Sequence, residues 1–227
     1  MGGGEGGGSK KGLVIALVVL VVVAGVAAAW FFYFREKCTA AARFAKGEGK
    51  LTALSEEGEM QTQRLDAHNV TCDPNAIQRF RLVRDGAGKF QYSFGCTAGV
   101  DLGTATPTST SFNDNGQGLN IFLDRHDVKC KEGSVLTRFK LSQNPAADSN
   151  QYRYDYTCRA VDKELVCRDV ASRPCEGWCE GVDGEGQLVY LDRHDVKCDA
   201  DEAMSQFKLI RPTPDTIGYT YRCCKIK

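Results

Sequence analysis

The sequence predicts an all-β domain made of three repeats behind one N-terminal transmembrane helix. Two observations support this prediction. The motif LDRHDVKC occurs twice, at residues 123–130 and 191–198, and a degenerate copy, LDAHNVTC, occupies residues 65–72. Repetition of one motif indicates a fold assembled from copies of one supersecondary unit. The second observation is an apolar run at residues 13–34 that contains no charged residue.

The apolar run at 13–34 is long enough to cross a bilayer. Its 22 residues would form a helix of roughly 33 Å, which matches the hydrocarbon core. The aromatic cluster WFFYF at 30–34 suits the lipid–water interface. A signal peptide cleaved at 27–29 is the alternative, but cleavage would expose this cluster at the new N-terminus. We therefore expect a flexible glycine-rich tail at 1–12, an uncleaved single-pass anchor at 13–34 and a stalk or linker at 35–58.

Two sequence rules disagree about the side of the membrane on which the C-terminal domain lies. Lys10 and Lys11 precede the apolar run, whereas five basic residues follow it by position 50. An excess of basic residues marks the cytosolic flank of an anchor. The chain also has 11 cysteines, which favour an oxidising compartment. The sequence leaves the topology of the anchor open.

Two further landmarks follow each copy of the motif in the same order. The first is a phenylalanine inside the pattern F-[RK]-L, and the second is an aromatic strand that ends in cysteine. The phenylalanines are Phe80, Phe139 and Phe207, and the strands read FQYSFGC, YRYDYTC and IGYTYRC. The landmarks define a three-repeat, disulfide-rich β domain at 59–227, with units at about 59–98, 117–160 and 185–227.

Each unit is expected to contain about four short strands. In the last strand the aromatic residues alternate with other residues, as in a strand with one buried face. We interpret its tyrosines as core walls whose hydroxyls reach an edge, with an aromatic sugar-binding platform as the alternative. The insert at 99–116 reads as a loop, and the insert at 161–184 reads as a disulfide-linked excursion. Three such units predict a β-prism-like or β-trefoil-like domain without choosing between the two.

Each unit carries one motif cysteine and one strand cysteine. Their separations are 24, 28 and 25 residues, and this equal placement predicts equivalent disulfides. Closing loops of this size is worth about 3–4 kcal/mol each. The three expected pairs are Cys72–Cys96, Cys130–Cys158 and Cys198–Cys223.

Five cysteines remain outside this scheme, so at least one is free or forms an intermolecular bond. Cys38 lies four residues beyond the apolar run and is the candidate for an interchain link or a lipidated thiol. Cys167, Cys175 and Cys179 offer three thiolates for zinc, but no histidine lies near them and C-x₂-C spacing is absent. The pairing of these four cysteines and of Cys224 stays open.

The three histidines, His68, His126 and His194, occupy the same position in each repeat. On a threefold axis they could bind a metal. Residues present in every repeat usually serve its fold, so we expect a turn or a strand-edge hydrogen bond to the neighbouring Asp. The sequence has no G-x-S-x-G, H-E-x-x-H or glycine-rich phosphate motif. We therefore expect no metal, no cofactor and no enzymatic activity.

Charge and modification motifs narrow the range of partners. The chain has 29 basic and 29 acidic residues, which argues against a nucleic-acid partner. The sequon Asn69-Val70-Thr71 would be glycosylated only if the domain entered the secretory lumen.

The pattern LDRHDVKC…FKL…YxYxC behind an N-terminal anchor resembles membrane-anchored virion proteins of large double-stranded DNA viruses of algae, with the minor capsid proteins of the chlorella viruses as the nearest comparison. The resemblance implies a structural protein between the virion inner membrane and the capsid, with the lipid membrane and shell proteins as partners. Such virions assemble in the cytoplasm and use virus-encoded thiol oxidases, which would reconcile a cytosolic domain with its cysteines.

At fold level alone, the threefold repeat also resembles the prism of vitelline outer-layer protein, and this likeness carries no function. The alternative function is a glycan- or receptor-binding module on the surface of a virion or cell.

Overall fold

The computed structural model describes residues 49–56, 61–85, 88–146, 149–172 and 186–227. These ranges hold 14 β-strands and four short 3-10 helices. The expected tail and anchor, together with Cys38, Cys175 and Cys179, lie outside the described residues. Among the residues that are described, no helix has the length and apolar character needed to cross a membrane.

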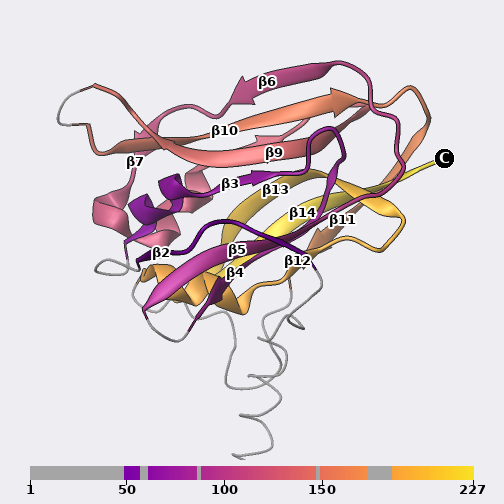
Figure 1. The fold of residues 1–227 in the computed structure, drawn as a ribbon. Helices are drawn as coiled ribbons and strands as arrows, with labels where there is room; N and C mark the ends of the chain where they lie inside the picture. Colours follow the sequence, from indigo (N-terminus) through magenta and orange to yellow (C-terminus); the bar gives the residue numbers. More distant parts are fainter. Residues whose placement is uncertain (1–48, 57–60, 86–87, 147–148, 173–185) are drawn as a thin grey trace, which may run out of the picture. The chain divides into compact units, whose positions relative to one another are not determined.

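The strands form three antiparallel sheets, so the described part of the chain is all-β, as predicted (Figure 1). The first sheet has the order β1 (Lys50–Leu51), β5 (Lys89–Cys96), β4 (Ile77–Arg84) and β12 (Val196–Lys197), and β2 (Ser55–Glu56) also pairs with β5. The second has the order β3 (Asn69–Thr71), β9 (Ser134–Gln143), β10 (Gln151–Ala160) and β6 (Ala105–Ser109), and β7 (Asn113–Asp114) also pairs with β10. The third has the order β11 (Leu165–Ala171), β14 (Thr216–Ile226), β13 (Glu202–Thr213) and β8 (Asp127–Lys129).

In each sheet, one edge strand is formed by the last residues of a repeated motif. That motif is distant in sequence from the long strand with which it pairs. The motif at 65–72 supplies β3 to the second sheet, the motif at 123–130 supplies β8 to the third, and the motif at 191–198 supplies β12 to the first. The motif valine lies opposite the landmark phenylalanine each time: Val70 opposite Phe139, Val128 opposite Phe207 and Val196 opposite Phe80. Each motif therefore completes a sheet whose long strands come from another segment.

The opposite edges of the first and second sheets contain residues that the sequence analysis assigned to a stalk and a loop. The expected stalk at 35–58 includes β1 and β2, and the expected loop at 99–116 includes β6. The backbone of β6 pairs with β10 over its whole length, although its side chains are mostly exposed. A strand without a buried face lacks the alternation that marks strands in a sequence, so its composition predicted a loop.

The centre of the domain is a triangle of phenylalanines, one from each sheet. The ring centroids of Phe80, Phe139 and Phe207 are 4.9 Å apart in all three pairs. Tyr92, Tyr154 and Tyr219 pack edge-on against this triangle at centroid distances of 5.6–6.4 Å. Such edge-to-face pairs add to the free energy gained by burying the rings.

The tyrosines of the repeated strands are core walls, as predicted. All six are at most 7 % exposed, which contradicts the alternative of a sugar-binding platform. The hydroxyls of Tyr156 and Tyr221 donate to the carbonyls of Lys129 and Lys197, each at 3.1 Å, and so reach a sheet edge.

Each motif begins in a 3-10 helix and leaves it at the histidine. These helices are η1 (Thr62–Ala67), η3 (Asn120–Arg125) and η4 (Leu188–Arg193), and η2 (Gly116–Gly118) precedes η3. The motif leucine is buried in each helix, and its carbonyl accepts the backbone N–H of the histidine three residues later at 3.1–3.3 Å. This hydrogen-bonded turn at the end of each 3-10 helix fixes the backbone position of the histidine, whose side chain is buried in the core.

Candidate functional site

Each motif histidine forms a hydrogen bond with the hydroxyl of the residue that directly follows an outer strand: Thr52 after β1, Thr110 after β6 and Ser172 after β11. The imidazole Nδ1 lies 2.8 Å from the Thr52 hydroxyl in His68, 2.9 Å from that of Thr110 in His126 and 3.3 Å from that of Ser172 in His194. Each hydroxyl oxygen accepts a backbone N–H from a core tyrosine: that of Tyr92 at 2.9 Å, Tyr154 at 3.0 Å and Tyr219 at 2.7 Å. The hydroxyl hydrogen is therefore free to donate to Nδ1, which assigns the neutral tautomer with its proton on Nε2.

The histidines serve the strand edge as expected, but through a different partner. The predicted bond to the neighbouring Asp is wrong, because Nδ1 bonds a hydroxyl that lies 16 or 22 residues earlier. The sequence gives no signal for this partner, since Thr52, Thr110 and Ser172 lie in segments without a shared motif.

Burial keeps these imidazoles neutral. Desolvation lowers the pKa of His68, His126 and His194 to about 4 in each case, with a smaller contribution from Arg125 at His126 and from Arg193 and Arg81 at His194. Their Nδ1 atoms are used in hydrogen bonds, and within the described residues no histidine belongs to a group of side chains whose ligand atoms lie close enough together to hold a metal.

A hydroxyl beside an imidazole is also the arrangement of a nucleophile and its base. Ser172 and His194 form the pair closest to that chemistry, yet their side chains are 8 % and 1 % exposed. The Ser172 oxygen is occupied by the Tyr219 N–H, and its proton acceptor has a pKa of about 4. The pair binds a strand edge and gives a substrate no access.

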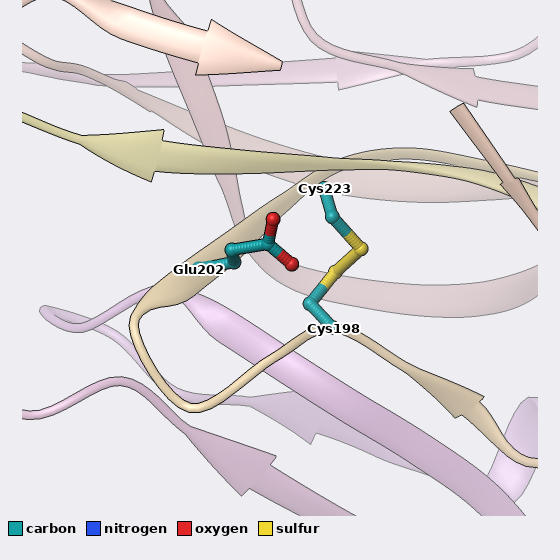
Figure 2. A group of neighbouring side chains, drawn as sticks. All are labelled: Cys198, Glu202 and Cys223. Atoms are coloured by element: carbon teal, nitrogen blue, oxygen red, sulfur yellow. A yellow bond between two sulfur atoms is a disulfide. The ribbon is translucent and has the colours of Figure 1, made fainter. Parts of the chain in front are cut away.

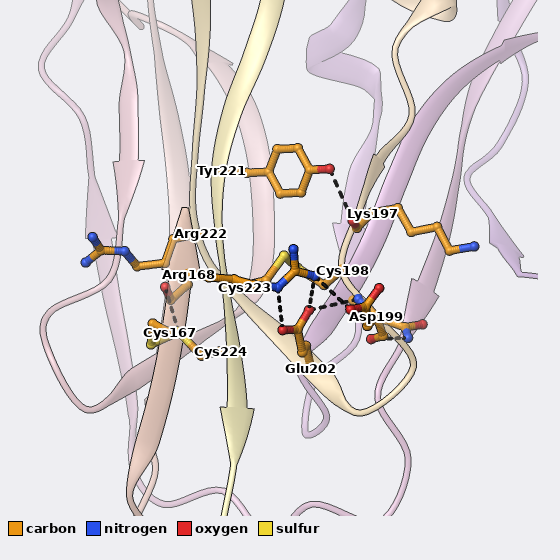
Figure 3. The surroundings of a disulfide bond; sticks show 12 residues. Cys167, Arg168, Lys197, Cys198, Asp199, Glu202, Tyr221, Arg222, Cys223 and Cys224 are labelled. Carbon is orange, nitrogen blue, oxygen red and sulfur yellow. Dashed lines mark hydrogen bonds and ion pairs between the residues drawn. A yellow bond between two sulfur atoms is a disulfide. The ribbon is translucent and has the colours of Figure 1, made fainter. Parts of the chain in front are cut away.

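The three disulfides expected from the repeat are present: Cys72–Cys96, Cys130–Cys158 and Cys198–Cys223. A fourth, Cys167–Cys224, joins β11 to β14, where the two residues lie opposite each other. Adjacent residues of a strand point to opposite faces, so Cys223 and Cys224 form bonds on opposite sides of β14 (Figure 3). Sequence reasoning missed this bond because β11 was not recognised as a strand.

One group of side chains near the third sheet has the composition of a metal site. Cys198, Glu202 and Cys223 place their ligand atoms within 4.8 Å of one another. The two sulfurs are bonded to each other, so neither is a thiolate (Figure 2). The Glu202 carboxylate accepts two bonds from Arg168, at 2.8 and 2.7 Å, and one from the backbone N–H of Asp199 at 2.9 Å (Figure 3). This group stabilises the turn that leads into β13.

Paired charges cover the surface around these disulfides. Arg168 holds the pKa of Glu202 below its usual range, and Arg222 does the same for Asp169. Arg159 binds Asp73 with its Nε 2.6 Å from a carboxylate oxygen. Most of these pairs are exposed and contribute little to stability individually.

The described residues form a small hollow beside His126 and a larger groove near the third sheet. The small hollow, of about 10 Å³, has room for about one water molecule. The groove, of about 410 Å³, lies between the β8–β9 turn and the third sheet, and we name it the Lys131 groove. Its lining residues are Lys129, Cys130, Lys131, Glu132, Gly133, Ser134, Leu165, Cys167, Ser205, Gln206, Arg222 and Cys224. The sequence analysis did not single out this groove, because its walls come from four separate segments of the chain.

Comparison of the chain with protein-family models, curated proteins and solved structures finds no match.

Proposed function

We propose that the chain is a non-enzymatic structural protein that tethers a rigid β domain to a membrane. In this proposal, residues 13–34 cross the bilayer and the β domain is a spacer or clamp between that membrane and a protein layer. The supporting observation is that the repeated residues are used inside the fold. The phenylalanines pack at the centre, the histidines bind strand edges, and the motif cysteines form disulfides.

We infer further that the domain is a pseudo-threefold prism. Three separate sheets around one aromatic triangle support a prism over a trefoil. The cyclic exchange of motif strands ties the sheets together, and four disulfides restrict them further. A body built in this way presents fixed surfaces to a neighbour at little cost in ordering.

The particular setting that we propose is the interface between the inner membrane and the capsid of a virion. The resemblance of the repeat to minor capsid proteins of large algal viruses motivates this setting. The paired surface charges support a protein layer as the partner: Asp73 binds Arg159, Asp169 binds Arg222 and Asp201 binds Lys225. Such a surface suits packing against proteins better than long-range capture of a charged polymer.

The proposal is tested by fractionating purified particles and host membranes, with quantitative mass spectrometry of each. We expect the chain in a fixed ratio to the shell proteins, and we expect it to stay with the membrane through an alkaline carbonate wash. Deleting residues 1–34 should release it from that membrane. Recovery only from host membranes, or release of the full chain by carbonate, would contradict the proposal.

One observation favours the alternative of a surface-exposed binding module, and that observation is the Lys131 groove. The buried tyrosines no longer support glycan stacking, so a ligand would have to be recognised through polar and charged groups. Particles that assemble normally without the protein, combined with glycan binding by the full chain, would replace the tether by this alternative.

A further inference from the structure

The Lys131 groove exists because the third sheet departs from the second at two equivalent positions. In the second sheet, Asp73 follows the motif cysteine and Arg159 follows the strand cysteine. These two side chains form a two-point ion pair, with Nε–Oδ1 at 2.6 Å and Nη2–Oδ2 at 3.3 Å. The Arg159 Nη1 also donates to the carbonyl of Gly103 at 2.8 Å. Salt-bridged side chains therefore occupy this position in the second sheet.

In the third sheet the same two positions hold Lys131 and Cys224. Cys224 is bonded to Cys167 and cannot fill the space as the arginine does. Lys131 carries the opposite charge to Asp73, is exposed, and has no ion-pair partner among the residues that the structure describes. The result is a groove of about 410 Å³ that is lined by the unpaired cation Lys131. This volume is within the range of small-molecule sites.

The charges that line the groove are mainly positive. Lys129, Lys131 and Arg222 stand against one carboxylate, Glu132. Arg222 is already engaged by Asp169, with its Nε 2.7 Å and its Nη2 3.1 Å from the carboxylate oxygens. Neither lysine has an ion pair within the described residues, so both are left for a ligand, although Lys129 lies close enough to Asp169 to help lower the pKa of that carboxyl.

The remainder of the groove is polar. Gln206 contributes its amide, whose Nε2 already donates to Asp127 at 2.8 Å, whereas the Ser134 and Ser205 residues in the wall are only 2 % and 7 % exposed, and no aromatic side chain lines the groove. Lysine binds phosphate and sulfate groups as a mobile point charge, and hydroxyl and amide groups suit the hydroxyls of a sugar. A neutral sugar would lack the aromatic face on which such ligands commonly stack.

We propose that the Lys131 groove is a binding site for a sugar that carries a phosphate or sulfate group, with Lys129 and Lys131 holding the anionic group. The site is independent of the membrane tether, and its failure would leave the proposed structural function untouched.

The test is calorimetric titration of the full-length protein, kept in a mild detergent, with glucose 6-phosphate, glucose 6-sulfate and glucose. We expect at least one of the two anionic sugars to bind and glucose not to bind. Lys131→Gln and Lys129→Gln should each weaken binding about tenfold, the usual loss for one charge-assisted contact. Lys163→Gln removes an exposed charge outside the groove and should leave the affinity unchanged.

A charge reversal makes the test sharper. Lys131→Asp places the residue of the second sheet in the groove and should abolish binding, while the thermal unfolding midpoint stays within a few degrees of the wild type. The two glutamine variants decide the matter if the aspartate variant does not fold. Equal heats for glucose and both anionic sugars, or an equal loss of affinity in Lys163→Gln, would overturn the proposal.

Discussion

The buried histidines predict a loss of stability in mild acid. Each has a pKa of about 4 in the folded protein, against an ordinary value of 6.5. As the pH falls from about 6.5 towards 4, these histidines therefore bind protons in the unfolded chain but stay neutral in the folded protein. The stabilisation is complete above pH 6.5 and decreases below it, because unfolding then takes up protons.

The magnitude follows from these two pKa values. At pH 5, each histidine lowers the free energy of unfolding by about 2 kcal/mol relative to pH 7.5. Three histidines together lower it by about 6 kcal/mol, which is a large share of the typical stability of a domain. The paired carboxylates, such as Asp73 and Glu202, have pKa values below the ordinary range and titrate mostly below this window. Burial raises the pKa of Asp66 and Asp195, so their protonation opposes part of the loss.

The assay is guanidinium unfolding of the disulfide-bonded protein, followed by circular dichroism at pH 7.5 and pH 5. His126→Asn keeps an acceptor for the Thr110 hydroxyl and removes one titrating group, so the difference between the two pH values should shrink by about 2 kcal/mol. Lys163→Gln is the control and should keep the full difference. A free energy of unfolding that changes by less than about 1 kcal/mol between the two pH values would refute the argument for neutral, desolvated imidazoles.

Three further predictions concern the core, the fourth disulfide and the anchor. Phe139→Ala should lower the free energy of unfolding by about 3–5 kcal/mol. The control Phe112→Ala loses only the contact of its ring with Arg153, at 4.5 Å, and should lower the free energy of unfolding by about 1 kcal/mol or less. Equal losses would show that the aromatic triangle is not central. Limited reduction with peptide mapping should open Cys167–Cys224 before the other three bonds, because Cys167 is exposed; earlier reduction of a motif disulfide would contradict this order. Removing residues 1–34 should give a soluble domain with the same β-sheet circular dichroism, and persistent membrane association of the truncated chain would argue against a single apolar anchor.

The repeat explains why much of the fold could be predicted from the sequence. A motif that recurs with its cysteine and its aromatic strand predicted the three disulfides and the buried tyrosines, since equal spacing implies equal structure. The exchange of motif strands between sheets could not be predicted, because β3, β8 and β12 are only two or three residues long. Strands this short carry no sequence pattern that identifies the strand with which they pair. Their register depends on the packing of the motif valines beside the central phenylalanines.

The candidate site was less accessible to sequence reasoning than the fold. The hydroxyl partners of the histidines directly follow β1, β6 and β11, outer strands with little periodicity, and β6 in particular has exposed side chains. The Lys131 groove depends on the absence of an ion pair that the second sheet has. A comparison of the repeats residue by residue would reveal Lys131 and Cys224 as departures, but only the paired strands show that these positions face one another.

The central claim is that the β domain lies between a membrane and a protein layer. Cross-linking mass spectrometry on intact purified particles tests it directly, through lysines such as Lys163 and Lys208. We predict cross-links from the β domain to a shell protein, in a pattern that is the same in every preparation. Cross-links confined to the chain itself, in particles that contain it, would contradict the account.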